Sequence, residues 1–366
     1  MTIAARLVTT ITAPLDPASA DAPELLCRPG RTLLVQRGDA EVVAFDVDGP
    51  DARRGSEVRF PAPWPRRFGT VAVSPARDAA VFAGVHAVRS VGASGATRWE
   101  VRHGCWGGCP VQHASSDEYA DDGGHVYPDS GSVAVSADGG LVWAHVRGPL
   151  AGDGNAEEDD EELWVVLDAE SGRVMGRVST GTVASQSLHT PHPDPSQMGL
   201  SLGEGEEGSP VLWGRWDGRQ LTAEQVGVER ILLAVSPSGR RLLTVPVGQW
   251  SLLLHDLGHG STVVGRLDAA DSVPAHPRNS GTDRVFWDVE AAFVDEDTVV
   301  AGTSECDAPY GPVRHWLVDV DGMRLLGELS YPFPVVGPAR TAGSGRWYTL
   351  SKDGAPVHLW ELDRLE

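Results

Sequence analysis

Lysine is almost absent from this chain. Lys352 is the only lysine among 30 basic residues, which stand against 51 acidic residues and give a formal net charge of -21. A surface of this charge repels phosphate backbones and anionic lipid headgroups, so neither nucleic acid nor a membrane is an expected partner. The simplest consequence of the charge is solubility.

Long apolar runs and cysteines are also scarce. No stretch approaches the roughly 18 apolar residues that a membrane-spanning helix needs. Residues 1–12 lack the charged leader of a secretory signal, and threonines interrupt their short apolar stretch, so a strand is expected there instead. Four cysteines in 366 residues are too few for a disulfide framework, and Cys27 and Cys306 stand alone in sequence. A reducing, cytoplasmic location is therefore expected.

Catalytic signatures are missing as well. The chain has no Gly-x-Ser-x-Gly elbow, no Walker lysine and no glycine-rich dinucleotide fingerprint on a strand-to-helix turn. The acidic stretch at residues 153–162 lacks the turn glycine and the distal glutamate of an EF-hand, so a solvated loop is expected there. No catalytic residue is predicted.

What the sequence does contain is a repeat. Seven times, at intervals of about 50 residues, an apolar strand leads into a turn with Gly or Asp, a second apolar strand, and a strand ending near Asp. The clearest copy spans residues 235–267. The turns after the inner strands fall near Gly30, Arg77, Gly139, Pro193, Gly239, Glu296 and Gly345. This pattern predicts an all-β, seven-bladed β-propeller, because such repeats bury one continuous core only when stacked.

We predict one domain over residues 1–366. The last repeat, 337–363, ends one strand short, so we expect residues 5–12 to pair beside residues 357–362 and close the ring, which removes exposed strand edges. The predicted blades are 15–61, 62–102, 131–180, 184–226, 229–268, 283–330 and 337–363 plus 5–12.

Three of these segments resemble WD40-type repeats: Val-Ser-Pro-Ser-Gly-Arg-Arg-Leu at 235–242, Val-Ser-Ala-Asp-Gly-Gly-Leu at 135–141 and Leu-Trp-Glu-Leu-Asp at 359–363. The chain is similar to a divergent, acidic, bacterial WD40-like β-propeller, and the resemblance covers nearly its whole length. The resemblance implies a platform for protein–protein interaction more often than an enzyme.

Long connections are expected to gather on one face of the propeller. In a propeller, the connection from an outer strand to the next inner strand lies on the same face as the loop between the second and third strands. Insertions in these connections build binding sites. The carboxylates of 153–162, with Glu204, Glu206 and Glu207, predict a negative rim that suits a basic partner. The long connections are 103–130, 151–162, 204–209, 269–286 and 304–312.

The segment 103–130 carries the densest chemistry. His103, Cys105, Cys109 and His113 are soft ligands within eleven residues that zinc could use, although their spacing matches no established finger. A Cys105–Cys109 disulfide is the second alternative. The third, which we favour at this stage, is an ordered loop with ordinary thiols, so that no cofactor is expected.

Aromatic and imidazole side chains of the same segment are the predicted binding residues: Trp106, His113, Tyr119, His125 and Tyr127. Most tryptophans fall on predicted strands, where they pack between blades. Trp106 lies in a glycine-rich loop instead. We expect it to be exposed, where it can anchor a partner or stack on a ligand.

These observations predict a cytoplasmic, monomeric scaffold that binds a protein or peptide, with a basic one favoured, through a loop-rich acidic face. The alternative is an enzyme of specialised metabolism with a His/Cys site in the central mouth of the propeller. In that case acid, base or metal-ligand roles fall to His103, Cys105, Cys109, His113 and His125.

Overall fold

The computed structural model describes residues 1–28, 30–48, 57–109, 112–125, 128–153, 161–205, 208–278, 284–303, 313–354 and 356–363. Its contacts divide the chain into two compact units. The N/C unit comprises Met1–Ala18, Ala22–Thr32 and Glu229–Glu366, and the middle unit comprises Ser19–Asp21 and Leu33–Val228. The single-domain organisation stays a prediction.

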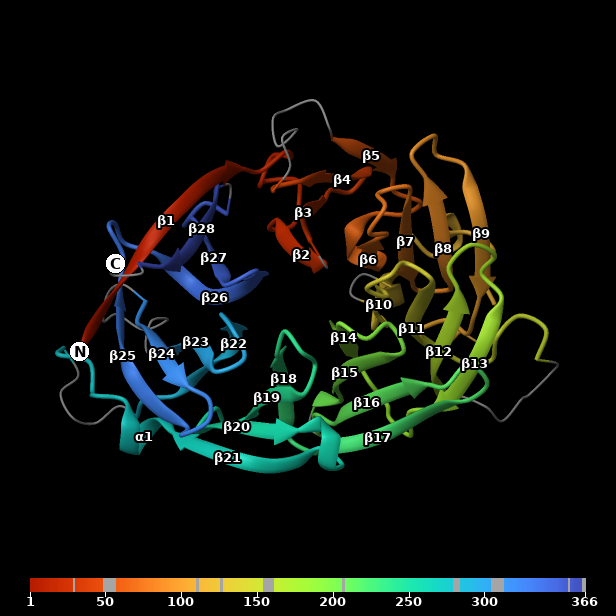
Figure 1. Ribbon diagram of the computed structural model, residues 1–366. Coiled ribbons are helices and arrows are strands. Elements are labelled where there is room, and N and C mark those ends of the chain that lie inside the picture. Colours follow the sequence, from red (N-terminus) through yellow and green to blue (C-terminus); the bar gives the residue numbers. More distant parts are fainter. Residues whose placement is uncertain are drawn as a thin grey trace. The chain divides into compact units, whose positions relative to one another are not determined.

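In the part of the chain described, the middle unit is built from meanders of four consecutive antiparallel strands (Figure 1). The first sheet, β2 (Glu24–Arg28), β3 (Arg31–Arg37), β4 (Glu41–Asp46) and β5 (Val58–Pro61), begins in the N/C unit. The next contains β6 (Gly69–Val73), β7 (Ala79–Gly84), β8 (Ala87–Gly92) and β9 (Thr97–Arg102). The third contains β10 (Val133–Val135), β11 (Leu141–Arg147), β12 (Glu162–Asp168) and β13 (Val174–Ser179). The fourth contains β14 (Gln186–Pro191), β15 (Gln197–Gly203), β16 (Val211–Trp216) and β17 (Leu221–Gly227).

The N/C unit has one further sheet of four strands and one of eight. The smaller contains β18 (Arg230–Val235), β19 (Arg241–Pro246), β20 (Ser251–Asp256) and β21 (Thr262–Asp268). The larger has the order β22-β23-β24-β25-β1-β28-β27-β26. Its strands are β22 (Trp287–Phe293), β23 (Thr298–Thr303), β24 (His315–Asp319), β25 (Arg324–Ser330), β26 (Val336–Gly343), β27 (Arg346–Leu350), β28 (Pro356–Leu362) and β1 (Thr2–Thr12).

Helices are short throughout the described residues. They are η1 (Arg66–Phe68), η2 (Ser116–Glu118), η3 (Gly123–His125), η5 (Leu257–His259) and α1 (Ala269–Ser272). No helix among the described residues is both long enough and apolar enough to span a membrane. The all-β class predicted from the repeat is confirmed, whereas the number of blades and their predicted boundaries stay predictions.

Strand β1 creates the eight-stranded sheet, because it pairs with a strand on each of its two edges. Its residues Ala5–Thr12 pair antiparallel with β28, which confirms the predicted pairing of the N-terminal strand with the last blade. Its first residues, Thr2–Ala4, also pair in parallel with Glu328–Ser330 of β25. In Figure 1 the red strand β1 accordingly runs between the blue strands β25 and β28. The parallel pairing was not predicted, and through it β1 joins two four-stranded groups.

The turns after the inner strands show why glycine recurs there. Five of the seven predicted turn positions have a positive φ, between 57° and 81°: Gly30, Arg77, Gly139, Gly239 and Gly345. Only glycine adopts this backbone conformation without a steric cost from Cβ. The repeat spacing could therefore be read from glycines, with Arg77 as the one exception among these five.

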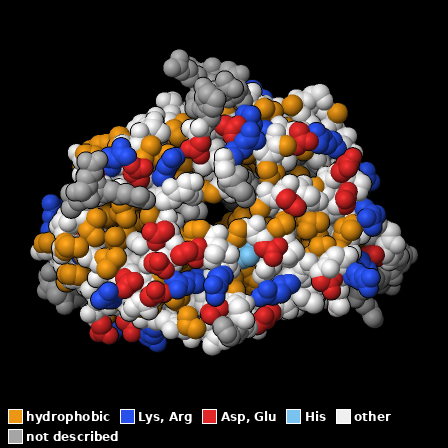
Figure 2. Space-filling view, viewed as in Figure 1, with side chains coloured by type: hydrophobic (Ala, Val, Ile, Leu, Met, Phe, Trp, Pro, Cys, Tyr) orange, Lys and Arg blue, Asp and Glu red, His pale blue; other side chains and the backbone are white. Residues whose placement is uncertain are grey.

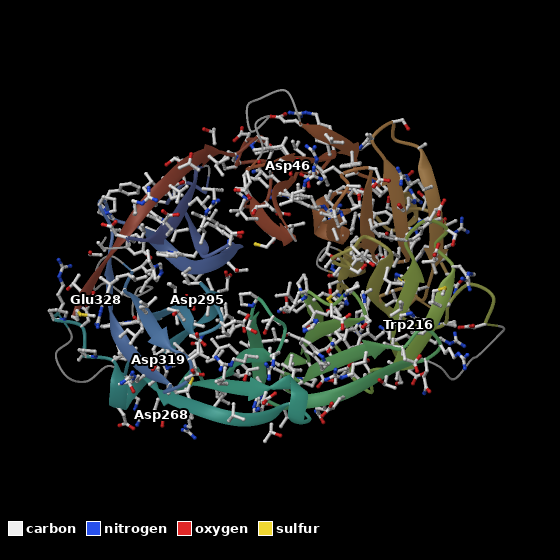
Figure 3. All side chains as sticks on the ribbon, viewed as in Figure 1. Asp46, Trp216, Asp268, Asp295, Asp319 and Glu328 are labelled. Atoms are coloured by element: carbon white, nitrogen blue, oxygen red, sulfur yellow. The ribbon has the colours of Figure 1, made fainter. Side chains whose placement is uncertain are left out.

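Two aspartates at the ends of third strands bind arginine side chains. Figure 3 labels two of them, Asp46 at the end of β4 and Asp319 at the end of β24. Asp46 lies 3.0 Å from the guanidinium of Arg77, which belongs to the next sheet of the middle unit. Asp319 accepts a hydrogen bond from Arg324 at 2.8 Å, across the turn into β25. The recurrent Asp therefore has a structural role.

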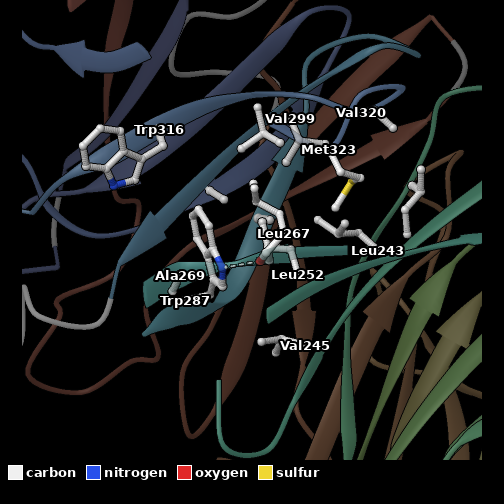
Figure 4. Packing of buried hydrophobic residues seen from close by; sticks show 14 of the residues in the cluster. Leu243, Val245, Leu252, Leu267, Ala269, Trp287, Val299, Trp316, Val320 and Met323 are labelled. Atoms are coloured by element: carbon white, nitrogen blue, oxygen red, sulfur yellow. Dashed lines mark hydrogen bonds between the residues drawn. The ribbon is translucent and has the colours of Figure 1, made fainter. Parts of the chain in front are cut away.

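The core of the N/C unit lies between neighbouring sheets (Figure 4). Trp287 is fully buried and donates from its indole N–H to the carbonyl of Leu267 at 3.0 Å. Leu243, Leu252 and Trp316 pack in the same cluster. Burial of such side chains contributes about 25 cal/mol per Å² of apolar surface removed from water, so alternating apolar residues on each strand hold adjacent sheets together.

In the middle unit tryptophans pack tightly enough to require a glycine. Trp143 and Trp164 are fully buried, with ring centroids 5.4 Å apart. A Cβ at Gly214 of β16 would lie 2.7 Å from the Trp164 ring and 2.8 Å from the Trp143 ring. The prediction that strand tryptophans pack in the core is confirmed, and Gly214 makes their packing possible.

Replacement of Gly214 by Ala is expected to lower the free energy of unfolding by about 1–3 kcal/mol, because a side chain forced into a packed core displaces its neighbours. Gly203→Ala on the adjacent strand is the matched control. The nearest atoms to its Cβ would all belong to Gln186, with the side chain at 3.3 Å and the backbone carbonyl oxygen at 3.8 Å, and its effect is expected to stay within about 0.5 kcal/mol. Urea unfolding of both variants measures the difference, and equal losses would refute the packing argument.

Candidate functional site

The connection between β9 and β10 is folded back onto the sheets of the middle unit. The amide of His103 donates to the carbonyl of His86 at 2.9 Å, and the amide of Trp106 donates to that of Val85 at 3.0 Å. Gly104 donates to Arg147 at 2.9 Å, and a Cβ on Gly104 would lie 2.0 Å from the carbonyl oxygen of Gly148. Glycine is therefore required where this loop crosses β11.

The position of Trp106 differs from the sequence-based expectation. Its side chain is 2 % exposed and packs edge-on against His145, with ring centroids 5.2 Å apart. The expectation of an exposed tryptophan is wrong, because the short hydrogen-bonded turn at residues 105–108 directs the indole inward. Trp106 therefore anchors the loop to the sheets, and a surface contact with a partner does not follow from its position.

Four side chains of this loop converge on one point. The ligand-forming atoms of Cys105, Cys109, His113 and His125 all lie within 4.8 Å of one another. The Nε2 atom of His125 lies 3.2 Å from the sulfur of Cys105 and 3.6 Å from that of Cys109. Cys105 and His125 are buried, at 2 % and 3 % exposure. Two thiols and two imidazoles of this kind are a donor set for a borderline-soft cation.

Both imidazoles are oriented by a carboxylate. The Nδ1 atom of His125 lies 3.0 Å from Asp122, and that of His113 lies 3.1 Å from Glu118. Since a carboxylate accepts, each Nδ1 carries the proton, and each Nε2 is left with its lone pair. The Nε2 atom of His113 is buried and has no hydrogen-bond partner among the described residues.

Tyr119 packs against this cluster from the inside. Its ring stacks on His125 with centroids 5.0 Å apart and meets His113 edge-on at 5.0 Å. Its hydroxyl lies 2.8 Å from Nδ1 of His86, which burial holds neutral by lowering its pKa to about 4. Burial also raises the pKa of Tyr119. The aromatic ring thus fixes both imidazoles against the sheets.

His103, a candidate ligand from the sequence, lies apart from the cluster. Its Nδ1 atom donates to the carbonyl of Gly104 at 2.7 Å, and burial lowers its pKa to about 4. The structure brings Cys105, Cys109 and His113 together with His125 instead. From the sequence, His125 is a possible metal ligand only for the enzyme alternative, and a further signal favours it: Asp122 precedes it by three residues, which places a carboxylate within reach of its ring.

The structure places three of the remaining predicted binding residues in the cluster. Tyr119, His113 and His125 point into the cluster, and Tyr127 lies outside the described residues. Burial and the neighbouring Cys105 thiol raise the pKa of Cys109 to about 11. Without a bound cation this thiol is protonated near neutral pH and is a poor nucleophile.

Exposed carboxylates cover the outer side of the same loop. We call the exposed residues Asp117, Glu118, Asp121 and Asp122 the acidic loop surface. The loop is also held to the connection after β11, since Gln112 donates to the carbonyl of Pro149 at 2.9 Å. Of the acidic stretch 153–162, residues 154–160 lie outside the described part, as do Glu206 and Glu207, so the predicted rim stays a prediction.

Figure 2 shows red Asp and Glu side chains interspersed with blue Lys and Arg side chains among the described residues. The acidic loop surface is distinguished by its sequence: residues 112–125 contain no Lys or Arg. Four exposed carboxylates therefore lie within six residues, beside one guanidinium from outside the loop, that of Arg67, which donates to the carbonyl of Ala120 at 3.0 Å.

Comparisons with known proteins identify the fold. No protein-family model matches the chain, and no curated protein matches it. Among solved structures, the Myceliophteria thermophila Cps50 (Swd1) β-propeller domain is similar, with a TM-score of 0.55 and 12% identity over 98% of this chain and 100% of that one. Kuenenia stuttgartiensis hydrazine synthase is similar too, with a TM-score of 0.55 and 13% identity over 98% of this chain and 99% of that one.

With its four-stranded antiparallel meanders, the chain has the β-propeller fold. At these identities the likeness defines the architecture alone, and the same architecture supports many chemistries.

Proposed function

We propose that this chain is a cytoplasmic, WD40-like interaction module that binds a basic protein or peptide segment at the acidic loop surface. The observation that carries the proposal is the two-sided construction of the loop. Asp117, Glu118, Asp121 and Asp122 are exposed on its outer side, while Tyr119 and His125 are buried on its inner side. A loop fixed in this way loses little conformational entropy on binding.

Electrostatics supports a basic partner. The acidic loop surface places four of the chain's 51 acidic residues close together in a protein with a formal charge of -21. Complementary charge accelerates association and rejects anionic competitors. The similar Swd1 structure is a propeller domain, which fits such a role.

An enzyme with a His/Cys site is the second candidate. The 3.2 Å contact between the sulfur of Cys105 and Nε2 of His125 favours it, because a thiol beside an imidazole is the arrangement of a cysteine nucleophile and its base. The similar hydrazine synthase structure shows that enzymes use this fold. We prefer the binding role, since Cys105 is 2 % exposed and a substrate would need to reach a buried sulfur.

Selection of random peptides by display against the full-length protein tests the proposal. We expect the selected peptides to be rich in Lys and Arg. Their affinity is expected to fall at least about tenfold in the Asp117→Lys/Asp121→Lys variant, because two attractive charges become repulsive. Fluorescence anisotropy at low and high salt measures this, and higher salt should weaken the wild-type complex.

The matched control is Glu170→Lys/Glu224→Lys, which changes the net charge equally at exposed positions outside the loop. These substitutions are expected to leave peptide affinity within about twofold, since Debye screening limits the reach of surface charges to roughly 10 Å. Equal losses in both variants, or selected peptides without basic enrichment, would reject the acidic loop surface as the binding site.

A further inference from the structure

We propose that Cys105, Cys109, His113 and His125 bind one Zn²⁺ ion, which ties the 103–125 loop to the sheets of the middle unit. This inference is independent of the proposed binding of a basic partner. It concerns the inner side of the loop, and the two sides are linked because Glu118 and Asp122 of the acidic loop surface accept the N–H groups of the imidazoles.

The two distances between the thiol sulfurs and His125 match those of a tetrahedral site. Zinc binds sulfur at about 2.3 Å and imidazole nitrogen at about 2.0–2.1 Å, so the sulfur and nitrogen atoms of a tetrahedron lie about 3.5 Å apart. The two sulfur-to-nitrogen distances to His125 are 3.2 Å and 3.6 Å. All four ligand atoms lie within 4.8 Å of one another. The cation can therefore enter without a large rearrangement of the loop.

The hydrogen bonds around the imidazoles prepare them as ligands. Metal-binding histidines almost always donate their other ring N–H to a carboxylate or carbonyl, which fixes the tautomer and ring orientation. His125 donates to Asp122 and His113 donates to Glu118, so both present Nε2 to the thiols. The buried, unpartnered Nε2 of His113 gains a partner when a cation binds.

The backbone leaves room for this arrangement at one glycine. A Cβ on Gly107 would lie 2.4 Å from Nε2 of His125 and would displace the ligand. The Cys105-to-Cys109 turn therefore needs glycine beside the imidazole. Close packing of the backbone against the His125 imidazole holds this candidate ligand in place, as expected for a metal site.

The ligand set identifies the ion and its role. Two thiolates and two imidazoles in a tetrahedron select zinc over the oxygen-preferring Mg²⁺ and Ca²⁺. Four protein ligands leave no open position, which is typical of structural zinc rather than of catalytic zinc. Binding replaces the thiol protons, so one Zn²⁺ enters as two protons leave.

Metal analysis of the purified full-length protein is the first test. We expect about one equivalent of zinc per chain, because structural sites of this type bind tightly at neutral pH. Cys109→Ser should lose the metal. Cys27→Ser is the matched thiol control: the Cys27 sulfur donates to the carbonyl of Thr341, and the substitution should keep one equivalent. Less than about a tenth of an equivalent in wild type, together with failure of the second test, would overturn the proposal.

Cobalt binding is the second test and works even where zinc was lost in purification or a variant folds poorly. Chelator-stripped wild type titrated with Co²⁺ should show the intense visible absorption of a tetrahedral site and a thiolate-to-cobalt charge-transfer band, both saturating at one equivalent. Absence of these bands, or bands that persist in Cys109→Ser, would reject the ligand assignment. A Cys105–Cys109 disulfide, seen as two fewer free thiols in the denatured protein, would reject it as well.

Variants of the carboxylates distinguish a zinc site from a loop that is only packed, because the zinc affinity should depend on the carboxylates that orient the imidazoles. Asp122→Ala should weaken zinc affinity about 10–100-fold, because the orienting hydrogen bond to His125 is lost. Asp117→Ala removes the same charge from the same loop but leaves both imidazole–carboxylate pairs intact, so its zinc affinity should match wild type. Competition with a chromophoric chelator measures both, and equal affinities in the two variants would contradict the orienting role.

Discussion

Deletion of residues 1–14 is expected to abolish cooperative unfolding of the N/C unit and to cause aggregation. Strand β1 pairs seven residues with β28 and three with β25, and its own Ala5 is buried. A net contribution of about 0.5–1.5 kcal/mol for each backbone hydrogen bond puts the loss on the order of 5 kcal/mol. Such a loss approaches the whole stability of a typical domain.

Exposure of strand edges explains the expected aggregation. Without β1, both β25 and β28 present unpaired N–H and C=O groups, and free edges of this kind pair with other chains. The apolar cluster that contains Trp347 and Trp360 also loses the cover of Ile3 and Leu7. The deletion therefore acts on hydrogen bonding and burial together.

Calorimetry and light scattering of the deletion variant measure the effect. Addition of a synthetic peptide of residues 1–14 should restore the thermal transition, which separates loss of the strand from general misfolding. Full-length Val8→Thr is the control, since Val8 is 37% exposed at the bulge of β1 and contributes little. A deletion variant with the melting temperature of the full chain would show that β1 is dispensable.

Acidification from pH 7 to pH 5 is expected to destabilise both units through buried histidines. Burial lowers the pKa of His189 in the middle unit to about 3 and that of His315 in the N/C unit to about 4. Both values lie below the roughly 6.5 of an unfolded histidine. The unfolded chain therefore binds more protons below pH 6.5, and stability falls as the pH falls through this range towards the folded pKa.

Hydrogen bonds show why each ring resists protonation. Nε2 of His189 accepts from the indole N–H of Trp164 at 3.0 Å, so a second ring proton would set two donors against each other. Nε2 of His315 donates to the carbonyl of Gly337 at 3.1 Å, and its Nδ1 accepts from the hydroxyl of Tyr331 at 2.6 Å. Each neutral imidazole is therefore matched to its partners.

The expected loss at pH 5 is about 2 kcal/mol for each histidine relative to neutral pH. His189→Gln and His315→Gln keep an amide that can satisfy the same partners but cannot titrate. Each variant should show a shallower pH dependence of urea unfolding, by about 1.4 kcal/mol per pH unit below pH 6.5. All proteins are compared at the same chelator concentration, so that metal release does not contribute. Slopes equal to wild type would refute the assignment.

The repeat made much of the fold predictable. Strands alternate apolar and polar residues, and turns with a positive φ select glycine, as at Gly139 and Gly239. Both signals are local, so they are written in consecutive residues. The pairing of β1 with β28 was predicted from the number of strands in each repeat. The last repeat has three strands where the others have four, which leaves an edge that the N-terminal strand can cover.

The candidate site was only partly predictable. Cys105, Cys109 and His113 are close in sequence and were grouped as candidate zinc ligands together with His103, whereas His125 was named as a possible metal ligand only for the enzyme alternative, and the burial of Trp106 was not predicted. A loop of 30 residues between β9 and β10 has no periodic pattern that fixes the direction of its side chains. Its course depends on contacts with other strands, such as those of Gly104 with Arg147.

By itself the sequence determined the order of the strands within each repeat, most of the turns and the net charge, because alternation, glycine placement and composition act over a few residues at a time. Only the tertiary structure decided which imidazole faces the two thiols and which carboxylates remain exposed. The physical reason is that these positions depend on how the 103–125 loop packs onto the sheets, where close approach at Gly104 and Gly107 excludes other arrangements.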